Sequence, residues 1–401
     1  MDQTPQALFN PQAADARVLG LLQPELQDLP ELLRTWSKPT PLRVSSGGTT
    51  SRAAASGCWS LDLSAHGPGV AWDGSNATVR FGAGCRVGEV LEALVPHQRT
   101  IAAGLSGLPG LGYVLTGGMG PLSRRFGLAV DQLKSLNGVW GSGEPFQLER
   151  SSHGQTAEWR GLCGAAPFLA VVTEVELATQ ELQPLWVQQS IGTPHQLADW
   201  IESAEHTEAG VSLQWHWDEP DQLRCLQVRC DPAPDHSRIE GLHQLPPLAS
   251  PPPAQPRLHA EVVGLLGPAN AASWRRLLPD LQELMAQRPH PSCTLSAQQL
   301  GDATAQIAVQ ETSFVHRDAV WKPWITAVWP AGDADLRHRS LAWLERVWQL
   351  MHPVCPGVHL AQLHDHLPFH RDELAQAFGP WLPSLRELKQ LRDPRGILPP
   401  L

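Results

Sequence analysis

A glycine cluster over residues 104–131 is the stretch of this chain whose residue types best suit ligand binding. It reads GLSGLPGLGYVLTGGMGPLSRRFGLAVD, with eight glycines set among apolar residues. Glycine allows positive φ and lets main-chain N–H groups approach a ligand, so such a cluster is typical of close contact with a bulky and often anionic group. A series of tight turns would also use glycine, but the closing letters SRRFGLAVD add specific residues in a fixed order.

Histidines near the C-terminus form the second candidate for chemistry. His359, His364 and His366 fall within one short segment, and an imidazole can act as a base near neutral pH. The spacing H-x-x-x-x-H-x-H is not that of a recognised metal site, and 17 histidines in the chain make chance clustering common. We therefore predict no metal site and expect most of these histidines to be exposed to solvent.

Strands and glycine turns must position the glycine cluster. An apolar strand runs into a Gly/Ser/Thr turn over residues 41–51, and a strand, a glycine turn and an amphipathic helix follow over residues 77–94. The spacing of Gly82, Gly84 and Gly88 departs from G-x-G-x-x-G, so we reject a Rossmann-type dinucleotide site.

The second half of the chain alternates β-rich and helical patterns. A strand over residues 171–177 leads into a polar segment that ends at Pro184, and we place a domain break there. The predicted strands after it cover residues 186–191, 211–217, 224–228, 260–265, 306–310 and 324–329. The predicted helices cover residues 195–204, 271–287 and 334–351. These patterns predict an antiparallel sheet backed by helices.

Composition excludes several classes of partner. Thirty Lys and Arg against forty Asp and Glu give a formal charge of −10, which argues against nucleic-acid and anionic-membrane surfaces. No stretch approaches the ~20 apolar residues of a membrane span, and the N-terminus lacks the order of a secretory signal, so we expect a cytoplasmic protein. Seven cysteines without a C-x-x-C pair indicate free thiols rather than a disulfide framework or a zinc site.

Taken in chain order, these blocks resemble a known family. The glycine cluster, the turn at residues 41–51, the strand at residues 171–177 and an Asp-Pro turn near residue 393 are similar to the FAD-binding domain of the vanillyl-alcohol oxidase/p-cresol methylhydroxylase (PCMH) superfamily. The berberine-bridge-enzyme-like branch is most similar. The resemblance implies an α+β fold, with a two-subdomain PCMH-type FAD-binding domain and a cap domain of antiparallel sheet backed by helices.

The resemblance also divides the chain. It implies lead-in helices at residues 1–34, the FAD-binding domain at residues 35–180 and a substrate or cap domain at residues 181–360. A C-terminal segment at residues 361–401 would return to the FAD-binding domain.

FAD is the cofactor that the resemblance implies. The pyrophosphate would be held by the amides of Ser46, Gly47, Gly48, Thr49 and Thr50. Further contacts would come from Gly112, Gly117, Gly118, Gly120, Val172 and Thr173. The bound isoalloxazine would accept a hydride from a small organic substrate of sugar-like or aromatic character, and would pass electrons to dioxygen or another acceptor.

Some residues depart from the family pattern on the cofactor side. Bicovalent members attach the flavin through a histidine and a cysteine, whereas this chain has Thr49 and Leu105 at those places. The resemblance therefore implies FAD that is bound without a covalent link. Leu111 and Thr116 stand where the family often has glycine, and residues 162–168 replace a glycine-rich run of the family. The added side chains of Leu111, Ala165 and Ala166 would crowd the cofactor.

The substrate side departs further. Residues 311–318 resemble the branch's Phe-x-His-Arg segment, but its later Tyr-x-Asn motif is missing, because Tyr113 is the only tyrosine in the chain. His359 takes the place of that tyrosine, and Gln362 or Ala361 that of the asparagine, so His359 and Gln362 are our candidate catalytic residues. Tryptophans on the predicted cap strands fit an aromatic substrate wall and core packing equally well: Trp215, Trp217, Trp321, Trp324 and Trp329.

Three functions stay open at this stage. An FAD-dependent oxidoreductase leads. A flavin-fold pseudoenzyme or metabolite-binding protein is favoured by the replaced glycines and the missing tyrosine, and opposed by the intact turn and the SRRFGLAVD block. An enolpyruvyl-sugar reductase that uses NADPH is third, because its catalytic serine and glutamate cannot be assigned. Fold analogy does not decide among them, since chemistry resides in the site.

Overall fold

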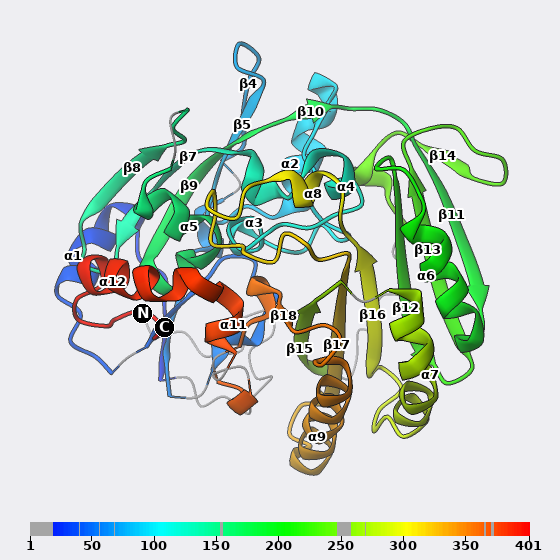
Figure 1. Ribbon diagram of the computed structural model, residues 1–401. Coiled ribbons are helices and arrows are strands. Elements are labelled where there is room, and N and C mark those ends of the chain that lie inside the picture. Colours follow the sequence, from blue (N-terminus) through cyan, green and yellow to red (C-terminus); the bar gives the residue numbers. More distant parts are fainter. Residues whose placement is uncertain are drawn as a thin grey trace.

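The chain forms two halves, each built on β-sheet, which lie on the left and right in Figure 1. The computed structural model describes residues 19–39, 41–55, 57–67, 69–152, 155–246, 258–268, 270–364, 366–369 and 373–401. The predicted α+β fold, with a PCMH-type domain and an antiparallel cap sheet, is confirmed. Residues 1–18 of the predicted lead-in lie outside the described residues.

Two sheets form the left half. A parallel sheet has the strand order β1-β3-β2, and an antiparallel sheet has the order β4-β5-β9-β7-β8. Their strands are β1 (Gly20–Leu22), β2 (Leu42–Ser45), β3 (Trp59–Asp62), β4 (Ala71–Asp73), β5 (Thr78–Gly82), β7 (Leu133–Trp140), β8 (Pro145–Glu149) and β9 (Ala170–Ala178). Their helices are α1 (Leu29–Arg34), α2 (Val87–Leu94), α3 (Leu111–Leu115), α4 (Ser123–Phe126) and α5 (Ala157–Leu169).

The short strands β6 (Arg99–Thr100) and β10 (Gln180–Glu181) pair with each other, and after β10 the chain passes to the right half. One sheet there has the order β14-β11-β13-β12-β16-β17-β15-β18, and every pairing in it is antiparallel. Its strands are β11 (Leu185–Gly192), β12 (Val211–Glu219), β13 (Gln222–Arg229), β14 (Ser237–Ile239), β15 (Leu258–Leu266), β16 (Thr294–Gln299), β17 (Trp321–Pro330) and β18 (Gly357–Val358). We call this half the cap.

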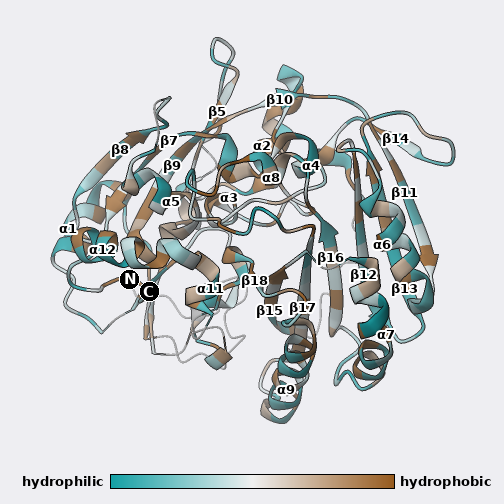
Figure 2. Ribbon diagram, viewed as in Figure 1, coloured by the Kyte–Doolittle hydropathy of each residue, from teal (hydrophilic) through white to brown (hydrophobic). Residues whose placement is uncertain are grey.

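Amphipathic helices cover the cap sheet. They are α6 (Leu197–Glu205), α7 (Ala271–Ala286) and α9 (Ala334–Met351), with the short α8 (Ala303–Gln306) near the other half. In α9 the buried residues recur every three or four positions, and the side chain of Asp333 caps the first turn by accepting from the Leu336 amide at 2.8 Å. Figure 2 shows mixed teal and brown turns on these helices, as one-sided burial requires.

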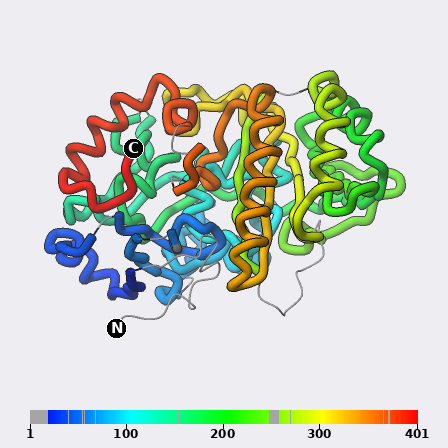
Figure 3. Tube along the Cα trace, turned by 90° about the horizontal axis from the view of Figure 1, so that it is seen from below, coloured from blue at the N-terminus to red at the C-terminus, as the bar shows by residue number. Residues whose placement is uncertain are grey.

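The C-terminal segment returns to the left half. Helices α11 (Leu374–Phe378) and α12 (Leu382–Arg392) follow the cap, and α12 packs against α5. The Leu42 amide donates to the Ile397 carbonyl at 2.7 Å, so the last residues extend the edge next to β2. Figure 3 shows this red segment at the same end of the molecule as the blue N-terminal one.

Two hydrophobic cores match the two halves. One holds the left half together with α11 and α12, and the other lies between the cap sheet and its helices. Trp215, Trp217, Trp321 and Trp329 are fully buried in the cap core. The sequence fitted an aromatic substrate wall and core packing equally well, and for these four tryptophans the substrate wall is wrong. Strand alternation turns their side chains toward the helices.

Most predicted cap elements are confirmed, and the helix at residues 334–351 matches α9 at both ends. The strand predicted at residues 306–310 is wrong, because α8 ends at Gln306 and a loop follows. The central strand β16 was missed; all six of its residues are buried, so polar side chains lie inside and the pattern is obscured. No helix in the described part of the chain is long and apolar enough to cross a membrane.

Candidate functional site

Free backbone amides line the turn that follows β2. Residues Ser46 to Thr50 connect β2 to a short 3-10 helix, Ser51–Ala54, and Gly48 has a φ of +66°. Within the described ranges, the amides of Gly47, Gly48, Thr49 and Thr50 donate to no other group. Buried or half-buried amides normally have partners, so four consecutive free ones form a cradle suited to an anion.

The glycine cluster packs directly on this turn. A Cβ on Gly47 would lie 2.5 Å from the Gly110 nitrogen, and a Cβ on Gly110 would lie 2.4 Å from the Gly47 nitrogen. The Ser46 hydroxyl accepts from the Leu111 amide at 3.0 Å and donates to the Ala83 carbonyl at 2.5 Å. The two loops can meet this closely only because both contact positions are glycine.

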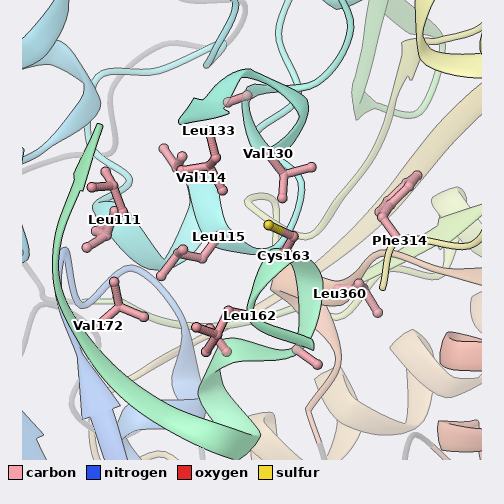
Figure 4. Close-up of a cluster of buried hydrophobic side chains, with 14 of the residues drawn as sticks. Leu111, Val114, Leu115, Val130, Leu133, Leu162, Cys163, Val172, Phe314 and Leu360 are labelled. Atoms are coloured by element: carbon pink, nitrogen blue, oxygen red, sulfur yellow. The ribbon is translucent and has the colours of Figure 1, made fainter. Parts of the chain in front are cut away.

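Two adjoining cavities open beside these loops. The larger is lined by Ser46–Thr50 together with Gly110, Gly112, Tyr113, Thr116 and Ala361, among others. The smaller is more apolar and is lined by Val172, Leu111 and Ala166, among others. Val44, Ser46, Gly112 and Pro167 line both. Figure 4 shows Leu111 on α3 and Val172 on β9, the elements that flank the smaller cavity.

The other predicted cofactor residues lie outside these cavities. A Cβ on Gly118 would meet the Ala129 side chain at 2.5 Å, and one on Gly120 would meet the Gly104 nitrogen at 2.8 Å, so both are packing positions. Thr173 donates its hydroxyl to the Asn137 carbonyl at 3.2 Å. Gly117 faces the cap, since a Cβ there would lie 3.8 Å from His359 Nε2.

A row of buried polar side chains crosses the cap sheet. Gln214 on β12 is in register with Gln298 on β16, which is in register with Lys322 on β17. All three are at most 5% exposed. Both polar atoms of Gln298 and the Oε1 atom of Gln214 lack a hydrogen-bond partner among the described residues. Such groups are rare in proteins and mark a place for a ligand or ordered water.

Lys322 supplies a cation to this wall. Its Nζ atom lies 4.4 Å above the Trp324 ring and makes no ion pair with a described residue. Burial lowers the pKa of Lys322 to about 7, because a desolvated ammonium is unfavourable. Near neutral pH this amine is therefore able both to donate and to accept a proton.

His359 is completely buried and lies within range of the charge of Lys322. Its Nδ1 faces the Gln362 Oε1 atom at 3.1 Å, and its Nε2 has no partner within the described ranges. Burial, and then the positive charge of Lys322, lower the pKa of His359 well below its usual range. Because Gln362 Oε1 accepts from Nδ1, the neutral ring keeps a lone pair on Nε2. The two candidate catalytic residues thus form one unit.

His364 and His366 surround a buried carboxylate. Glu261 on β15 pairs with His364 Nδ1 and with His366 Nε2, the latter at 3.1 Å, and Ser51 donates to Glu261 at 2.5 Å. Burial would raise the pKa of Glu261, but the charges and hydrogen bonds of the two imidazoles hold it well below its usual range. The expectation of solvent-exposed histidines is wrong for His359 and His364, which are at most 1% exposed, because β15 covers this segment.

Two buried arginines join the halves around the site. Arg317 makes a bidentate ion pair with Asp131 at 2.8 and 2.9 Å, so the Phe-x-His-Arg-like segment is tied to the end of SRRFGLAVD. Arg124 pairs with Asp302 and donates to the Val211 carbonyl at 2.6 Å. Arg317 is therefore buried rather than part of a surface turn. These pairs fix the cap relative to the cofactor loops.

The sequence analysis missed Gln214, Gln298, Lys322 and Glu261. None lies in a motif, and what unites the first three is their register across neighbouring strands. A polar residue inside an apolar strand pattern, such as Lys322 between tryptophans, is the signal that would have found one of them.

Comparison with known proteins agrees with this geometry. A family model described as an FAD binding domain matches residues 25–149. Across the whole fold, BBE-like #28 from Arabidopsis thaliana aligns with a TM-score of 0.82 at 14% identity, covering 97% of this chain and 93% of that one. The chain has the berberine-bridge-enzyme-like fold and carries an FAD-binding domain. The family resemblance is thereby confirmed at the level of fold.

Two further proteins are similar to this chain. Berberine bridge enzyme from Eschscholzia californica aligns with a TM-score of 0.77 at 16% identity, covering 96% of this chain and 89% of that one. FAD-dependent monooxygenase FUP4 from Fusarium proliferatum is 33% identical over 115 residues. That alignment spans 28% of this chain and 22% of the relative, so the similarity in sequence is confined to one part of each protein.

Proposed function

We propose that this chain is an FAD-dependent oxidoreductase that binds FAD without a covalent link and oxidises a small, polar organic molecule. Two observations carry the proposal: four amides without a partner among the described residues line a cavity, and a row of buried polar side chains crosses the cap sheet. Dioxygen or another acceptor would reoxidise the flavin. All seven cysteines are unpaired, which supports a cytoplasmic setting for the reaction.

The residues present fit the cofactor. The amides of Gly47 to Thr50 would hold the pyrophosphate, because they are free and they line the larger cavity. The apolar cavity beside Val172 would take a flat aromatic portion. Position 49 is threonine rather than the histidine to which a flavin could be bonded. The one tyrosine at the cavity, Tyr113, uses its hydroxyl as a donor to the Met119 carbonyl at 2.6 Å. We therefore propose a non-covalent complex.

The chain's own residues would handle the substrate proton. When bound, FAD supplies hydride acceptance. Lys322, with a pKa of about 7, would take the proton of a substrate hydroxyl. His359 Nε2 would accept a hydrogen bond from the substrate. The Oε1 atom of Gln214 and the amide of Gln298 would bind further polar groups of the substrate, since these buried atoms lack partners among the described residues. These roles favour a hydroxylated substrate over a purely apolar one.

A pseudoenzyme or metabolite-binding protein is the second candidate. Leu111 and Ala166 place side chains on the wall of the smaller cavity, at positions where the family has glycine. These side chains occupy space that a cofactor would otherwise fill. A ligand smaller than FAD would fit the remaining space beside the same free amides.

Anaerobic reduction of the flavin tests the enzyme proposal. Protein loaded with FAD is mixed, without dioxygen, with a panel of sugars, hydroxy acids and aromatic alcohols, and the visible flavin absorbance is followed. We expect at least one polyol or alcohol to bleach the bound flavin, and dioxygen to restore the colour. Bound FAD that no member bleaches, while dithionite does, would favour the pseudoenzyme.

A further inference from the structure

Three distant segments converge on one buried cluster. Ser51 belongs to the 3-10 helix after the cofactor turn, Glu261 to β15, and His364 and His366 to the segment after β18. One ligand atom from each of Glu261, His364 and His366 lies within 4.8 Å of the others. Glu261 and His364 are each 1% exposed at the side chain, and His366 is 14% exposed.

We propose that Glu261, His364 and His366 bind a divalent transition-metal ion of the zinc class. The two imidazoles approach different oxygens of one carboxylate, with His364 Nδ1 at Oε1 and His366 Nε2 at Oε2. Two nitrogens and one carboxylate are the ligand set of many three-residue zinc sites, in which water or another oxygen takes the fourth position. This site is separate from the proposed flavin chemistry and does not depend on it.

The imidazole rings are arranged for shared coordination. They stack with centroids 5.4 Å apart and planes 17° apart, and one nitrogen of each ring faces the carboxylate of Glu261. The Ser51 hydroxyl lies 3.2 Å from His364 Nδ1 and 3.5 Å from His366 Nε2, close enough to supply or order a fourth ligand. A single ion would satisfy all these groups at once, which a proton on one imidazole does not.

A nucleophilic triad is excluded by the contacts. In a Ser-His-acid triad the serine and the acid bind opposite nitrogens of the ring. Here Ser51 and Glu261 both face Nδ1 of His364, so the ring cannot pass a proton from the hydroxyl to a carboxylate on its far side.

The ion would brace the cofactor turn. Ser51 directly follows the free amides, and its neighbour Arg52 donates to the carbonyls of Leu360 and Leu363 at 2.8 and 3.0 Å. A metal at Glu261 would therefore tie the turn, the cap and the C-terminal segment together. Ligands so far apart in sequence close long loops, so binding would add to the stability of the folded state.

Metal loading of the purified full-length chain tests the proposal. The protein is incubated with ZnCl₂, dialysed and assayed by elemental analysis and thermal unfolding, and Co²⁺ is used as a spectroscopic probe. The variants are His366→Ala and Glu261→Gln. The matched control is His352→Ala, which removes a partly exposed histidine that lies outside the cluster, 3.5 Å from another buried glutamate, Glu373.

We expect about one Zn²⁺ per chain, a higher Tm with Zn²⁺, and visible Co²⁺ bands of a low-symmetry site. Both ligand variants should lose the Tm increase and the bands, while His352→Ala keeps them. Wild-type protein that retains no metal and shows no Tm change would overturn the proposal in favour of a hydrogen-bonded Ser-Glu-His network. Equal metal binding by His366→Ala would overturn it as well. If Glu261→Gln fails to fold, His366→Ala and the Co²⁺ spectrum still decide.

Discussion

The two sides of the candidate site are built in different ways. The cofactor side uses backbone groups from contiguous loops, with free amides at Gly47 to Thr50 and close glycine contacts. The cap side uses side chains from separate strands, namely Gln214, Gln298 and Lys322. Backbone amides bind an anionic group whatever the neighbouring side chains are. Side chains on strands can instead be replaced, without a change of fold, to suit a different substrate. We therefore expect substitutions on the two sides to separate cofactor binding from turnover.

Removal of the buried amine should have the largest effect. Lys322→Met keeps the length of the side chain and deletes the proton acceptor, so we expect kcat to fall about 100-fold while FAD binding is unchanged. Turnover and the flavin spectrum are measured on the same samples. Lys134→Met, at an exposed position on β7, is the control and should match the wild type. Loss of flavin from Lys322→Met would mean that the two sides are not separable.

Stability should depend on pH through the same residue. The pKa of Lys322 is about 7 in the folded chain and near 10.5 when unfolded. Between these values the unfolded chain holds a proton that the folded chain lacks, so folding stability rises with pH, by up to about 1.4 kcal/mol per unit. Below pH 7 both states are protonated and the term is constant. Urea unfolding from pH 7 to 9.5 should show the free energy of unfolding rising more with pH for the wild type than for Lys322→Met. The same rise in both proteins would contradict the low pKa of Lys322.

Crowding the cradle should weaken FAD without changing the cap. A Cβ at Gly47 would lie 2.5 Å from the Gly110 nitrogen, and relief of such overlap costs about 1–3 kcal/mol. Gly47→Ala should therefore bind FAD about tenfold more weakly in a fluorescence titration. Gly74→Ala, in an exposed turn, is the control, since its new Cβ meets only the Trp72 side chain at 3.4 Å. Normal FAD affinity in Gly47→Ala would argue against the cradle.

The smallest effect is expected at Gln298. Its amide has no partner among the described residues, so Gln298→Leu should raise KM by about 3- to 10-fold and leave stability nearly unchanged. The adjacent Gln299 is the matched control, because it donates to the Ala204 carbonyl at 2.6 Å and accepts from the Leu213 amide at 3.1 Å. Gln299→Leu should lose about 1–3 kcal/mol of stability in urea unfolding. Equal destabilisation of both would show that Gln298 is structural.

The same contrast explains what the sequence could predict. The cofactor turn and the glycine cluster are contiguous, so their letters revealed both the fold and the cavity-lining Ser46–Thr50 segment. The polar row depends on register between β12, β16 and β17, and β16 itself was not recognised. Glu261 meets His364 across 103 residues, a distance over which local patterns carry no information. Likewise, Gly118 and Gly120 belong to the cluster but serve packing rather than the cavity.

The central claim is that the free amides after β2 hold FAD without a covalent bond. An absorbance spectrum of the purified protein, supplied with FAD and taken before and after acid precipitation, tests it most directly. The account predicts flavin bands that copurify with the protein and pass wholly into the supernatant after precipitation. A colourless protein that takes up no added FAD, or flavin that stays in the pellet, would contradict it.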